Sequence, residues 1–521
     1  MSTAEARLSR QDGWKVLALV VLWLGATAWL RPLMLPDEGR YASVALEMLR
    51  SGDWLTPTLN GLPFFHKPPL FYWISGAAMG MTGSSELAAR SASLAGATLG
   101  AIALYLFVRR WCGMASARRV VIVLAVQPLF FLGAQFANLD MLVAGCITAT
   151  VLALAHAALS FEAGQPDRRA LWLAYGLSAL GVLAKGLIGF VLPAMIVGLW
   201  LILRRRWRSL LALLSLPGAL LFMLVAAPWF VLMQQRFDSF LHYFFVVQHF
   251  QRFAAGGFNN VQPFWFYPAV LAGCSLPCIL WSRPAFTRGY WRAEGTPGDV
   301  RLLMALMAGC VTLFFSLPQS KLIGYILPAV PALAWLMADA GQRAQASRKS
   351  RSWWKVSLAI SALIGLGVVL ALTANPRYSA RHMGQVLKAR HQPGEPVYML
   401  GEYVYDLPFY AGLDRPVRIV DDWQSPEIAR RDNWRREMVD AGAFDPALAG
   451  QVLVTPKQLP AALCGNEAAW VVGDAQATQM LPLLAQVAPV FSEHGQTLWR
   501  VDPRQVLPSC VETPNGGSAS R

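Results

Sequence analysis

The sequence predicts a polytopic α-helical membrane protein with a small α/β domain at its C-terminal end. Of the 521 residues, 55% are hydrophobic and 14% are charged, and the mean hydropathy is +0.41. Apolar stretches of membrane-spanning length recur along most of the chain. After Asn375 the composition changes to short β-like runs with polar segments between them. A soluble globular protein of this length does not have this composition.

Eleven apolar stretches, about 14–24 residues long, are the predicted transmembrane helices. They are Trp14–Leu33, Glu86–Val108, Val120–Gly133, Asp140–Ser160, Leu171–Ala184, Leu187–Leu203, Leu210–Met233, Phe264–Trp281, Leu302–Leu317, Leu322–Ala338 and Trp354–Ala374. The stretch Leu210–Met233 contains Pro217 and could hold a break, so we expect 11–13 helices in a transmembrane domain over residues 1–374.

The distribution of cations predicts the orientation in the membrane. One set of loops is rich in arginine and lysine, whereas the alternate set is poor in both. The rich loops hold Arg109, Arg110, Arg118, Arg119, Arg168, Arg169, Arg204, Arg205, Arg206, Arg208, Arg343, Arg348, Lys349 and Arg351. Under the positive-inside rule the N-terminus is cytoplasmic and the C-terminal region is outside. The net charge of +15 is not gathered in a basic patch with interleaved aromatic residues, so we expect no nucleic-acid partner.

The first outer loop contains an unusual pair of acids. The helical period over Tyr41 to Arg50 gives an apolar face and a polar face, so this stretch is a predicted amphipathic juxtamembrane helix. Extended back by one turn, the period places Asp37 and Glu38 beside the apolar face. A helix N-terminus favours acids and would explain the pair without chemistry. The presence of Lys67 and the membrane around them favour a site instead.

Residues 375–521 contain the four β-like runs Val397–Leu400, Val417–Val420, Gln451–Val454 and Ala469–Val472. They predict an α/β domain on the periplasmic side, of a size that folds alone, and a disordered tail after Pro508. Cys464 and Cys510 are the only cysteines after the last predicted span. An oxidising compartment lets them form a disulfide, which would close a loop of about 45 residues and contribute about 3–4 kcal/mol.

The outward loops together supply a set of charged and polar residues that suits a sugar and a phosphate. Lysine and arginine offset phosphate charge, and carboxylates bind hydroxyl or amino groups or accept a proton. The set is Asp37, Glu38, Arg40, Tyr41, His66, Lys67, Asp140, Lys185, His249, Arg252, Lys321 and Tyr325. The aromatic residues between Phe240 and Phe266 could form a wall for a lipid chain or an interfacial helix on the bilayer.

Six ordered motifs carry a family resemblance. They are Leu35-Pro36-Asp37-Glu38-Gly39-Arg40-Tyr41, Lys67-Pro68-Pro69-Leu70, Asn138-Leu139-Asp140, Ala184-Lys185-Gly186, His249-Phe250-Gln251-Arg252-Phe253 and Ser320-Lys321-Leu322-x-x-Tyr325-x-Leu327-Pro328. With these motifs the chain resembles the polyprenyl-phosphate-dependent membrane glycosyltransferases, in particular the aminoarabinose transferases of lipid A, which are related to the protein O-mannosyltransferases. The resemblance covers Leu30 to Pro331 and, more loosely, the outer domain. It implies the GT-C fold.

The resemblance also implies roles for individual residues. Asp37 would lie at the reaction centre, and Glu38 and Asp140 are further catalytic candidates. Lys67, Arg252, Tyr325 and Lys321 would bind the lipid phosphate, and Arg40, Tyr41 and Lys185 would bind the sugar or acceptor. The implied donor is a sugar, 4-amino-4-deoxy-L-arabinose, on undecaprenyl phosphate. The implied acceptor is lipid A or another envelope molecule on the periplasmic face of the inner membrane.

His66 departs from the family pattern, because an acidic residue usually precedes the Lys-Pro-Pro motif. In the family this neighbourhood can hold a metal, so His66 and His249 could bind zinc, although two ligands are too few for a complete site. The predicted reaction requires no cofactor. Polyprenyl phosphate is a good leaving group once cations offset its charge.

Two other functions remain as alternatives. One is sugar transfer to another envelope polymer or to a protein hydroxyl. The other is transport of a lipid or solute, which is less favoured because transporters place charges near the bilayer midplane, often in two related halves. Here the charges cluster in outer loops and no internal repeat is evident.

Overall fold

The structure is a computed structural model that describes residues 3–251, 260–292, 295–345, 347–376, 378–431, 433–464, 466–506 and 510. The chain forms two compact units. The first consists of Met1–Arg31 and His66–Asn375, and the second of Pro32–Phe65 and Pro376–Arg521. The predicted boundary after residue 374 lies next to the division at Asn375. However, the segment Pro32–Phe65 belongs to the second unit. The predicted division, which assigned all of residues 1–374 to the transmembrane domain, did not include this exchange.

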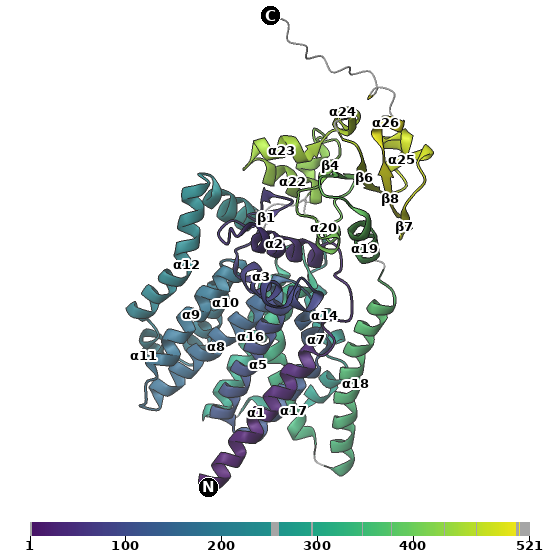
Figure 1. The fold of residues 1–521 in the computed structure, drawn as a ribbon. Helices are drawn as coiled ribbons and strands as arrows, with labels where there is room; N and C mark the ends of the chain where they lie inside the picture. Colours follow the sequence, from purple (N-terminus) through teal and green to yellow (C-terminus); the bar gives the residue numbers. More distant parts are fainter. Residues whose placement is uncertain are drawn as a thin grey trace, which may run out of the picture. The chain divides into compact units, whose positions relative to one another are not determined.

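All the secondary-structure elements described in the first unit are helices (Figure 1). Its helices are α1 Thr3–Gly25, α3 Leu70–Thr82, α4 Glu86–Ala89, α5 Ser91–Cys112, α6 Met114–Val126, α7 Pro128–Ala134, α8 Leu139–Glu162, α9 Arg168–Lys185, α10 Ile188–Leu203, α11 Trp207–Ala212, α12 Leu216–Arg236, α14 Phe266–Cys274, α15 Arg288–Trp291, α16 Gly295–Ser316, α17 Val330–Ala344 and α18 Arg348–Ala374, with a π-helix η1 His242–Gln251 and the 3₁₀ helices η2 Cys278–Phe286 and η3 Ile323–Ala329.

Among the described residues, six helices are long and apolar enough to cross a membrane, or up to eight if each of two bent helix pairs counts as one span. The bent pairs are α6 with α7, at 71°, and α14 with η2, at 116°. Each of the eleven predicted stretches coincides with a helix or a bent pair, although several are shorter than a full span. The break expected near Pro217 is present, because α11 ends at Ala212 and α12 begins at Leu216, with Ser215 as its N-cap.

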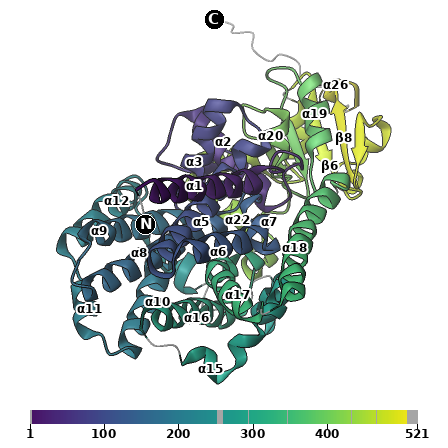
Figure 2. The same ribbon diagram turned by 90° about the horizontal axis from the view of Figure 1, so that it is seen from below.

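Small residues set the packing of α5 against α8 in the first unit. A Cβ on Gly96 would lie 2.5 Å from the Cα of Leu142, and a Cβ on Gly100 would lie 3.6 Å from the Cα of Gly145. The residue numbers of the two contacts increase in the same direction on both helices, so α5 and α8 run parallel. Gly96 and Gly100 therefore allow the two helices to pack closely. Both α5 and α6 lie beside α17 (Figure 2).

The second unit contains the C-terminal α/β domain together with the segment Pro32–Phe65. Its elements are α2 Asp37–Ser51, β1 Thr58–Leu59, β2 Leu62–Pro63, α19 Arg381–Arg390, β3 Val397–Leu400, α20 Leu407–Ala411, β4 Arg418–Val420, α21 Glu427–Arg430, α22 Trp434–Gly442, α23 Pro446–Val452, β5 Leu453–Val454, α24 Leu459–Cys464, β6 Ala469–Gly473, α25 Ala477–Met480, η4 Pro482–Gln486, β7 Phe491–Glu493, β8 Gln496–Val501 and α26 Pro503–Val506.

The main sheet has the strand order β5-β4-β3-β6-β8-β7. The four predicted runs are confirmed as the parallel strands β3 to β6. The two remaining strands, β7 and β8, were not predicted and extend the sheet in antiparallel fashion beyond β6. Tyr398, Val420, Val471, Trp499 and Val501 are buried in the core that the sheet forms with its helices.

The segment Pro32–Phe65 joins the α/β domain through specific hydrogen bonds. Asn60 and Gly61 connect β1 and β2 with φ angles of 55° and 76°, as in the two-residue turns that favour the Asn-Gly dipeptide. The Asn60 side chain then donates to the carbonyl of Val417 at 2.9 Å and accepts from the N–H of Val417 at 2.8 Å. The backbone N–H of Leu33 also donates to the hydroxyl of Tyr410 at 2.7 Å.

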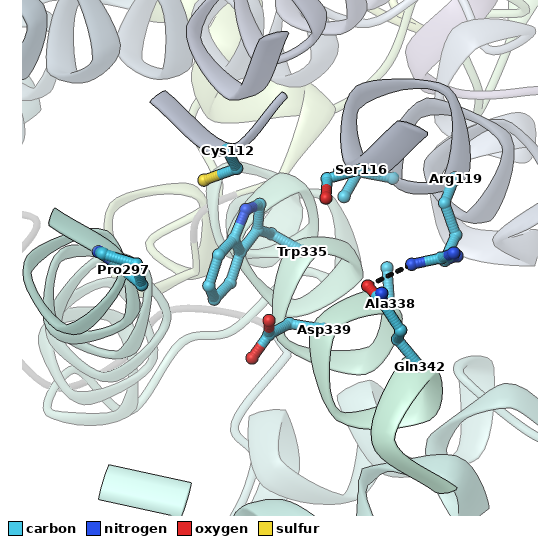
Figure 3. A pocket seen from close by; sticks show the side chains of 9 residues that line it. Cys112, Ser116, Arg119, Pro297, Trp335, Ala338, Asp339 and Gln342 are labelled. Carbon is cyan, nitrogen blue, oxygen red and sulfur yellow. Dashed lines mark hydrogen bonds between the residues drawn. The ribbon is translucent and has the colours of Figure 1, made fainter. Parts of the chain in front are cut away.

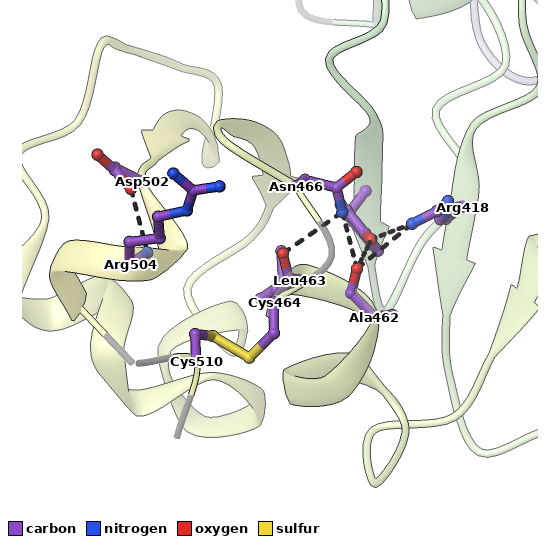
Figure 4. The surroundings of a disulfide bond; sticks show 9 residues. Arg418, Ala462, Leu463, Cys464, Asn466, Asp502, Arg504 and Cys510 are labelled. Carbon is purple, nitrogen blue, oxygen red and sulfur yellow. Dashed lines mark hydrogen bonds between the residues drawn. A yellow bond between two sulfur atoms is a disulfide. The ribbon is translucent and has the colours of Figure 1, made fainter. Parts of the chain in front are cut away.

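The predicted disulfide between Cys464 and Cys510 is confirmed, with the two Cα atoms 5.0 Å apart (Figure 4). It connects the end of α24 to the chain beyond α26, with a sequence separation of 46. The tail after Pro508, for which we expect disorder, lies outside the described residues except for Cys510.

Candidate active site

Asp140 and Lys185 form a buried ion pair in the first unit. Asp140 lies in the first turn of α8, where Asn138, the N-cap residue, accepts a hydrogen bond from its backbone N–H at 2.9 Å. Lys185 is the last residue of α9, and its Nζ donates to Oδ1 of Asp140. The exposed fractions of the lysine and aspartate side chains are 12% and 6%. Burying a single charge without a partner costs free energy, so the opposite charges of Asp140 and Lys185 offset each other.

Tyr325 and Gly324, both in η3, complete this cluster. The Nζ of Lys185 lies 3.9 Å from the centroid of the Tyr325 ring, within the range of a cation–π contact. Gly324 passes so close to Asp140 that any Cβ would overlap the carboxylate, so only glycine fits. The Tyr325 hydroxyl makes no hydrogen bond within the described part of the chain and can donate to a phosphate oxygen. Three residues predicted to serve different tasks therefore form one cluster.

Lys321 is a second buried cation of the first unit. Its side chain is 4% exposed, and Nζ donates to the carbonyls of Gln262 at 2.9 Å and Pro318 at 2.5 Å. Its backbone N–H donates to the carbonyl of Asn260 at 3.0 Å. No carboxylate pairs with this ammonium among the residues that the structure describes. An ammonium has three donors, so one donor and the full positive charge remain for an anion.

His66 and Lys67 begin the second segment of the first unit. His66 is 9% exposed, and its Nε2 lies 2.8 Å from the hydroxyl of Tyr243, which also accepts from the Gln248 side chain at 3.0 Å. Lys67 is half-buried and interacts with its neighbours. The side chain of His249 and the whole of Arg252 lie outside the described residues.

The described part of the chain holds no complete set of ligands for a metal ion. No group of three histidine, cysteine, aspartate or glutamate side chains is placed there to hold a metal ion. The zinc site suggested for His66 and His249 stays a prediction.

The aromatic residues around η1 differ from the predicted lipid wall. Phe240 and Phe244 are fully buried, with their ring centroids 5.3 and 6.4 Å from that of Trp229. They form part of the core beside α12 and do not face a lipid. Phe264 and Trp265, each 64% exposed, lie farther along the same predicted wall.

Asp37 and Glu38 lie in the first turn of α2, in the second unit, and differ sharply in exposure. Glu38 is 0% exposed and accepts a hydrogen bond from the backbone N–H of Met34 at 3.0 Å. The Asp37 side chain remains 27% exposed. Glu38 therefore has a structural partner in the preceding turn, whereas the carboxylate of Asp37 remains partly accessible.

Arg40 connects Asp37 to the α/β domain. Its Nη1 lies 3.4 Å from Oδ1 of Asp37, and its Nε lies 3.3 Å from Oε2 of Glu437. The ring of Tyr405 lies against the guanidinium, 4.7 Å from Cζ to the centroid, and the Tyr405 hydroxyl donates to Glu437. The described partners of Arg40 are thus protein groups, and a contact with the sugar stays a prediction. Tyr41 is 7% exposed, and its ring centroid lies 5.9 Å from Cζ of Arg40.

The predicted polar face of α2 is a docking face for the α/β domain. The hydroxyl of Ser43 donates to the carbonyl of Tyr405 at 2.8 Å, and Arg50 donates to the carbonyl of Leu413. Glu47 accepts from the Thr58 hydroxyl at 2.8 Å and from two backbone N–H groups of the β1–β2 turn. Burial raises the pKa of Glu47 to about 7, although these hydrogen bonds oppose the shift.

Sequence reasoning missed Tyr405 and Glu437, which are the partners that hold Arg40. Both lie in the C-terminal region, within ordinary polar segments after β3 and in α22. No spacing connects them to α2. The only available signal was the amphipathic pattern of α2, whose polar face requires a partner. The predicted site residues are thus divided, with Asp37, Glu38, Arg40 and Tyr41 in the second unit and the other described ones in the first.

The comparisons with known proteins agree with the resemblance. Residues 66–232 match the family model described as dolichyl-phosphate-mannose-protein mannosyltransferase. The undecaprenyl phosphate-alpha-4-amino-4-deoxy-L-arabinose arabinosyl transferase of Erwinia tasmaniensis is 32% identical over 370 residues, which are 69% of this chain and 66% of that protein. The transferase of the same name from Edwardsiella ictaluri is 32% identical over 388 residues, or 72% of this chain and 69% of that protein.

The match to a solved structure concerns the fold. The crystal structure of ArnT from Cupriavidus metallidurans bound to undecaprenyl phosphate superposes with a TM-score of 0.76 at 23% identity, covering 94% of this chain and 98% of that one. The predicted GT-C membrane fold is confirmed. The chain spans just under two thirds of the length of the Erwinia relative, at 66%, and slightly more of the Edwardsiella one. By sequence and by fold, the chain belongs to the family of undecaprenyl phosphate-alpha-4-amino-4-deoxy-L-arabinose arabinosyl transferases.

Proposed function

We propose that the protein transfers 4-amino-4-deoxy-L-arabinose from undecaprenyl phosphate to lipid A or a related envelope acceptor. Membership of the family supports the donor, since the relatives are named for it. The observation that carries the proposal for the site is the contrast within the acid pair. Asp37 remains 27% exposed and is held by Arg40, while Glu38 is buried and bound to the preceding turn. Asp37 is therefore the carboxylate available for chemistry.

In the reaction the bond between the anomeric carbon and the donor phosphate oxygen breaks, and a bond to an acceptor oxygen forms. The leaving phosphate keeps the electron pair. Cations offset its charge, so no general acid is needed. Lys321 supports this role because one of its three donors and its charge have no partner among the described residues. Tyr325 supports it through an unused hydroxyl, and we propose Lys67 and Arg252 as further phosphate ligands.

The task of Asp37 depends on the acceptor. A phosphate of lipid A is already anionic and requires no base, so Asp37 would orient it indirectly or bind the amino group of the sugar. A hydroxyl acceptor would require Asp37 to accept its proton. Arg40 lies 3.4 Å from the Asp37 carboxylate, so it would orient that carboxylate in either case.

We propose that the protein lies in the inner membrane with a cytoplasmic N-terminus and that the site and the α/β domain face the periplasm. The arginine-rich loops support this orientation. The disulfide between Cys464 and Cys510 supports it independently, because disulfides persist in oxidising compartments such as the periplasm.

Mass spectrometry of lipid A from cells with and without the protein tests the proposal. We expect a mass increase on lipid A that corresponds to one aminopentose and that disappears when the gene is deleted or carries Asp37→Asn. A modified protein or another modified envelope polymer, with unchanged lipid A, would assign the protein to the alternative acceptor class.

A further inference from the structure

A small cavity lies between the ends of four helices in the first unit, apart from the cluster of Asp140 and Lys185. Its volume is about 150 Å³, equivalent to about five water molecules. It is lined by Cys112, Ser116, Arg119, Val120, Pro297, Trp335, Ala338, Asp339 and Gln342 (Figure 3). These residues come from the end of α5 and the beginnings of α6 and α16, and from α17.

The cavity and the Asp140 cluster lie at opposite ends of the helices. Gly96 lies beside Leu142 near the start of α8, where Asp140 is also located. Cys112 follows Gly96 by 16 residues along α5, or about 24 Å at 1.5 Å per residue. The cavity therefore opens at the helix ends that carry the arginine-rich loops, where lipid headgroups meet a membrane protein.

Two opposite charges face the cavity from different helices. The guanidinium of Arg119 donates to the amide oxygen of Gln342, and this is its one hydrogen bond within the described ranges. Its other donors remain for a ligand, and its partner is neutral. Asp339 lies across the cavity on α17 and is 25% exposed. An anion is favoured beside Arg119, and a cation is favoured beside Asp339.

Arg301 fixes Asp339 in place and occupies one of its oxygens. The Nε and Nη2 atoms of Arg301 lie 3.2 and 2.8 Å from Oδ2 of Asp339, and Nη1 donates to the carbonyl of Tyr290 at 2.6 Å. The buried guanidinium of Arg301 is therefore fully engaged by protein groups. Both bonds from Arg301 go to Oδ2 of Asp339, and the Tyr290 side chain also interacts with this carboxylate. Oδ1 is the oxygen that Arg301 leaves to a ligand.

Trp335 gives the cavity an aromatic wall next to Asp339. Both side chains project from α17, with Pro297 opposite them and Ser116 near Arg119 (Figure 3). An ammonium near Asp339 would also contact the electron-rich face of the indole. The space is too small for a nucleotide and matches the polar part of a lipid headgroup.

We propose that this cavity binds the phosphoethanolamine headgroup of a membrane phospholipid, with its phosphate on Arg119 and its ammonium on Asp339. The pairing of charges distinguishes this zwitterion from an anionic headgroup. Phosphatidylglycerol would satisfy Arg119 but would bring no cation to Oδ1 of Asp339, whose Oδ2 already pairs with Arg301. The site requires no contribution from the sugar-transfer centre, so it stands independently of the proposed function.

Native mass spectrometry of the purified full chain in detergent tests this site, with equal amounts of phosphatidylethanolamine and phosphatidylglycerol added. We expect one phosphatidylethanolamine to remain bound when other lipids dissociate, and Arg119→Gln to weaken this binding at least tenfold. Arg169→Gln removes an exposed cation from the same end of the helices and should leave it unchanged. Equal retention of the two lipids, or unchanged binding by Arg119→Gln, would overturn the proposal.

Two further experiments test whether binding needs the space of the cavity and whether the ligand is a lipid headgroup or a free anion. Ser116→Leu keeps both charges and fills the cavity, so it should reduce binding as Arg119→Gln does, with thermal unfolding showing that the variant is folded. Soluble phosphoethanolamine should compete with the lipid, whereas inorganic phosphate should not. Equal competition by inorganic phosphate would assign the cavity to a free anion and contradict the lipid headgroup.

Discussion

Arg40 of α2 is paired with Glu437 of α22, with Nε of Arg40 and Oε2 of Glu437 3.3 Å apart. The two residues are distant in sequence but lie in the same unit, and Arg40 also lies 3.4 Å from the carboxylate of Asp37. The α/β domain thus reaches the proposed reacting carboxylate through one arginine.

The first prediction concerns Glu437 as a positioning residue. We expect Glu437→Gln to lower kcat by about 10-fold to 100-fold, because Arg40 loses its charged partner and Asp37 loses a fixed orientation. The KM for the lipid donor should stay unchanged, since neither residue is proposed to bind the phosphate. Steady-state kinetics of the purified variant provide both values.

Asp440→Asn is the matched control for this prediction. It removes a carboxylate from the same helix, one that lies 3.8 Å from Nε of Arg436. It should retain nearly full kcat. A variant Glu437→Gln with the wild-type kcat would show that Arg40 positions Asp37 without Glu437, and a rise in KM alone would indicate a role in binding.

The second prediction concerns the lipid phosphate. Lys67→Ala and Arg252→Ala should each weaken binding of undecaprenyl phosphate by about 10-fold to 150-fold, since each removes a charge-assisted hydrogen bond that contributes about 1.5–3 kcal/mol. Lys349→Ala removes an exposed cation from an arginine-rich loop and should have no effect. Equilibrium binding of a labelled lipid measures all three. Wild-type affinity in both test variants would contradict the assignment.

The third prediction follows from a buried carboxyl group in the α/β domain. Burial raises the pKa of Asp406 from its ordinary 3.8 to about 7, Ser379 and Ala380 oppose this shift through hydrogen bonds, and the charge of Glu38 adds to it. Between these two values the folded protein retains a proton that the unfolded chain has lost. The contribution of Asp406 to stability is therefore complete below about pH 4 and is lost as the pH rises through about 7.

Asp406→Asn imitates the neutral form and removes this titration. Between pH 5 and pH 8, the free energy of unfolding of the wild type should fall relative to that of the variant by about 1–3 kcal/mol. Unfolding of the full chain at several pH values measures this difference. Asp422→Asn, at an exposed position, should instead follow the wild type. Parallel curves for the wild type and Asp406→Asn would be inconsistent with a raised pKa.

The fourth prediction concerns the disulfide of the α/β domain. Denatured, unreduced protein should expose five reactive thiols to an alkylating reagent, because Cys464 and Cys510 are bonded and the other five cysteines are free. After reduction the number should rise to seven. Reduction of the folded protein should also lower its stability by about 3–4 kcal/mol. Seven thiols before reduction would exclude the bond in the protein as purified.

The membrane part of the fold could be predicted from the sequence because apolar length and helix-breaking residues are local signals. Pro217, for example, lies at the start of α12, where the predicted stretch Leu210–Met233 is interrupted. The four central strands of the sheet were equally evident, because buried parallel strands are short continuous apolar runs. β7 and β8 were missed, since Gln496–Val501 mixes polar residues with Leu498, Trp499 and Val501.

The candidate site could be predicted as a set of residues but not as an arrangement. The motifs contain Asp140, Lys185 and Tyr325, but only the fold shows that one ion pair and one ring contact join them. For Arg40, the sequence predicted the residue but not its contacts. Its motif suggested a ligand contact, whereas its partners Glu437 and Tyr405 come from a domain with no recognisable motif, because tertiary partners leave no periodic pattern in sequence.

The most direct test of the account is sugar transfer by purified Asp37→Asn. With undecaprenyl phosphate-linked aminoarabinose and lipid A, the wild type should release undecaprenyl phosphate and form modified lipid A. The variant should be at least about 100-fold slower, as expected on loss of a group that acts in the transition state. Glu38→Gln should instead lower the thermal stability of the protein. The folded fraction of this variant should keep its transfer activity. Wild-type turnover by folded Asp37→Asn would contradict the account.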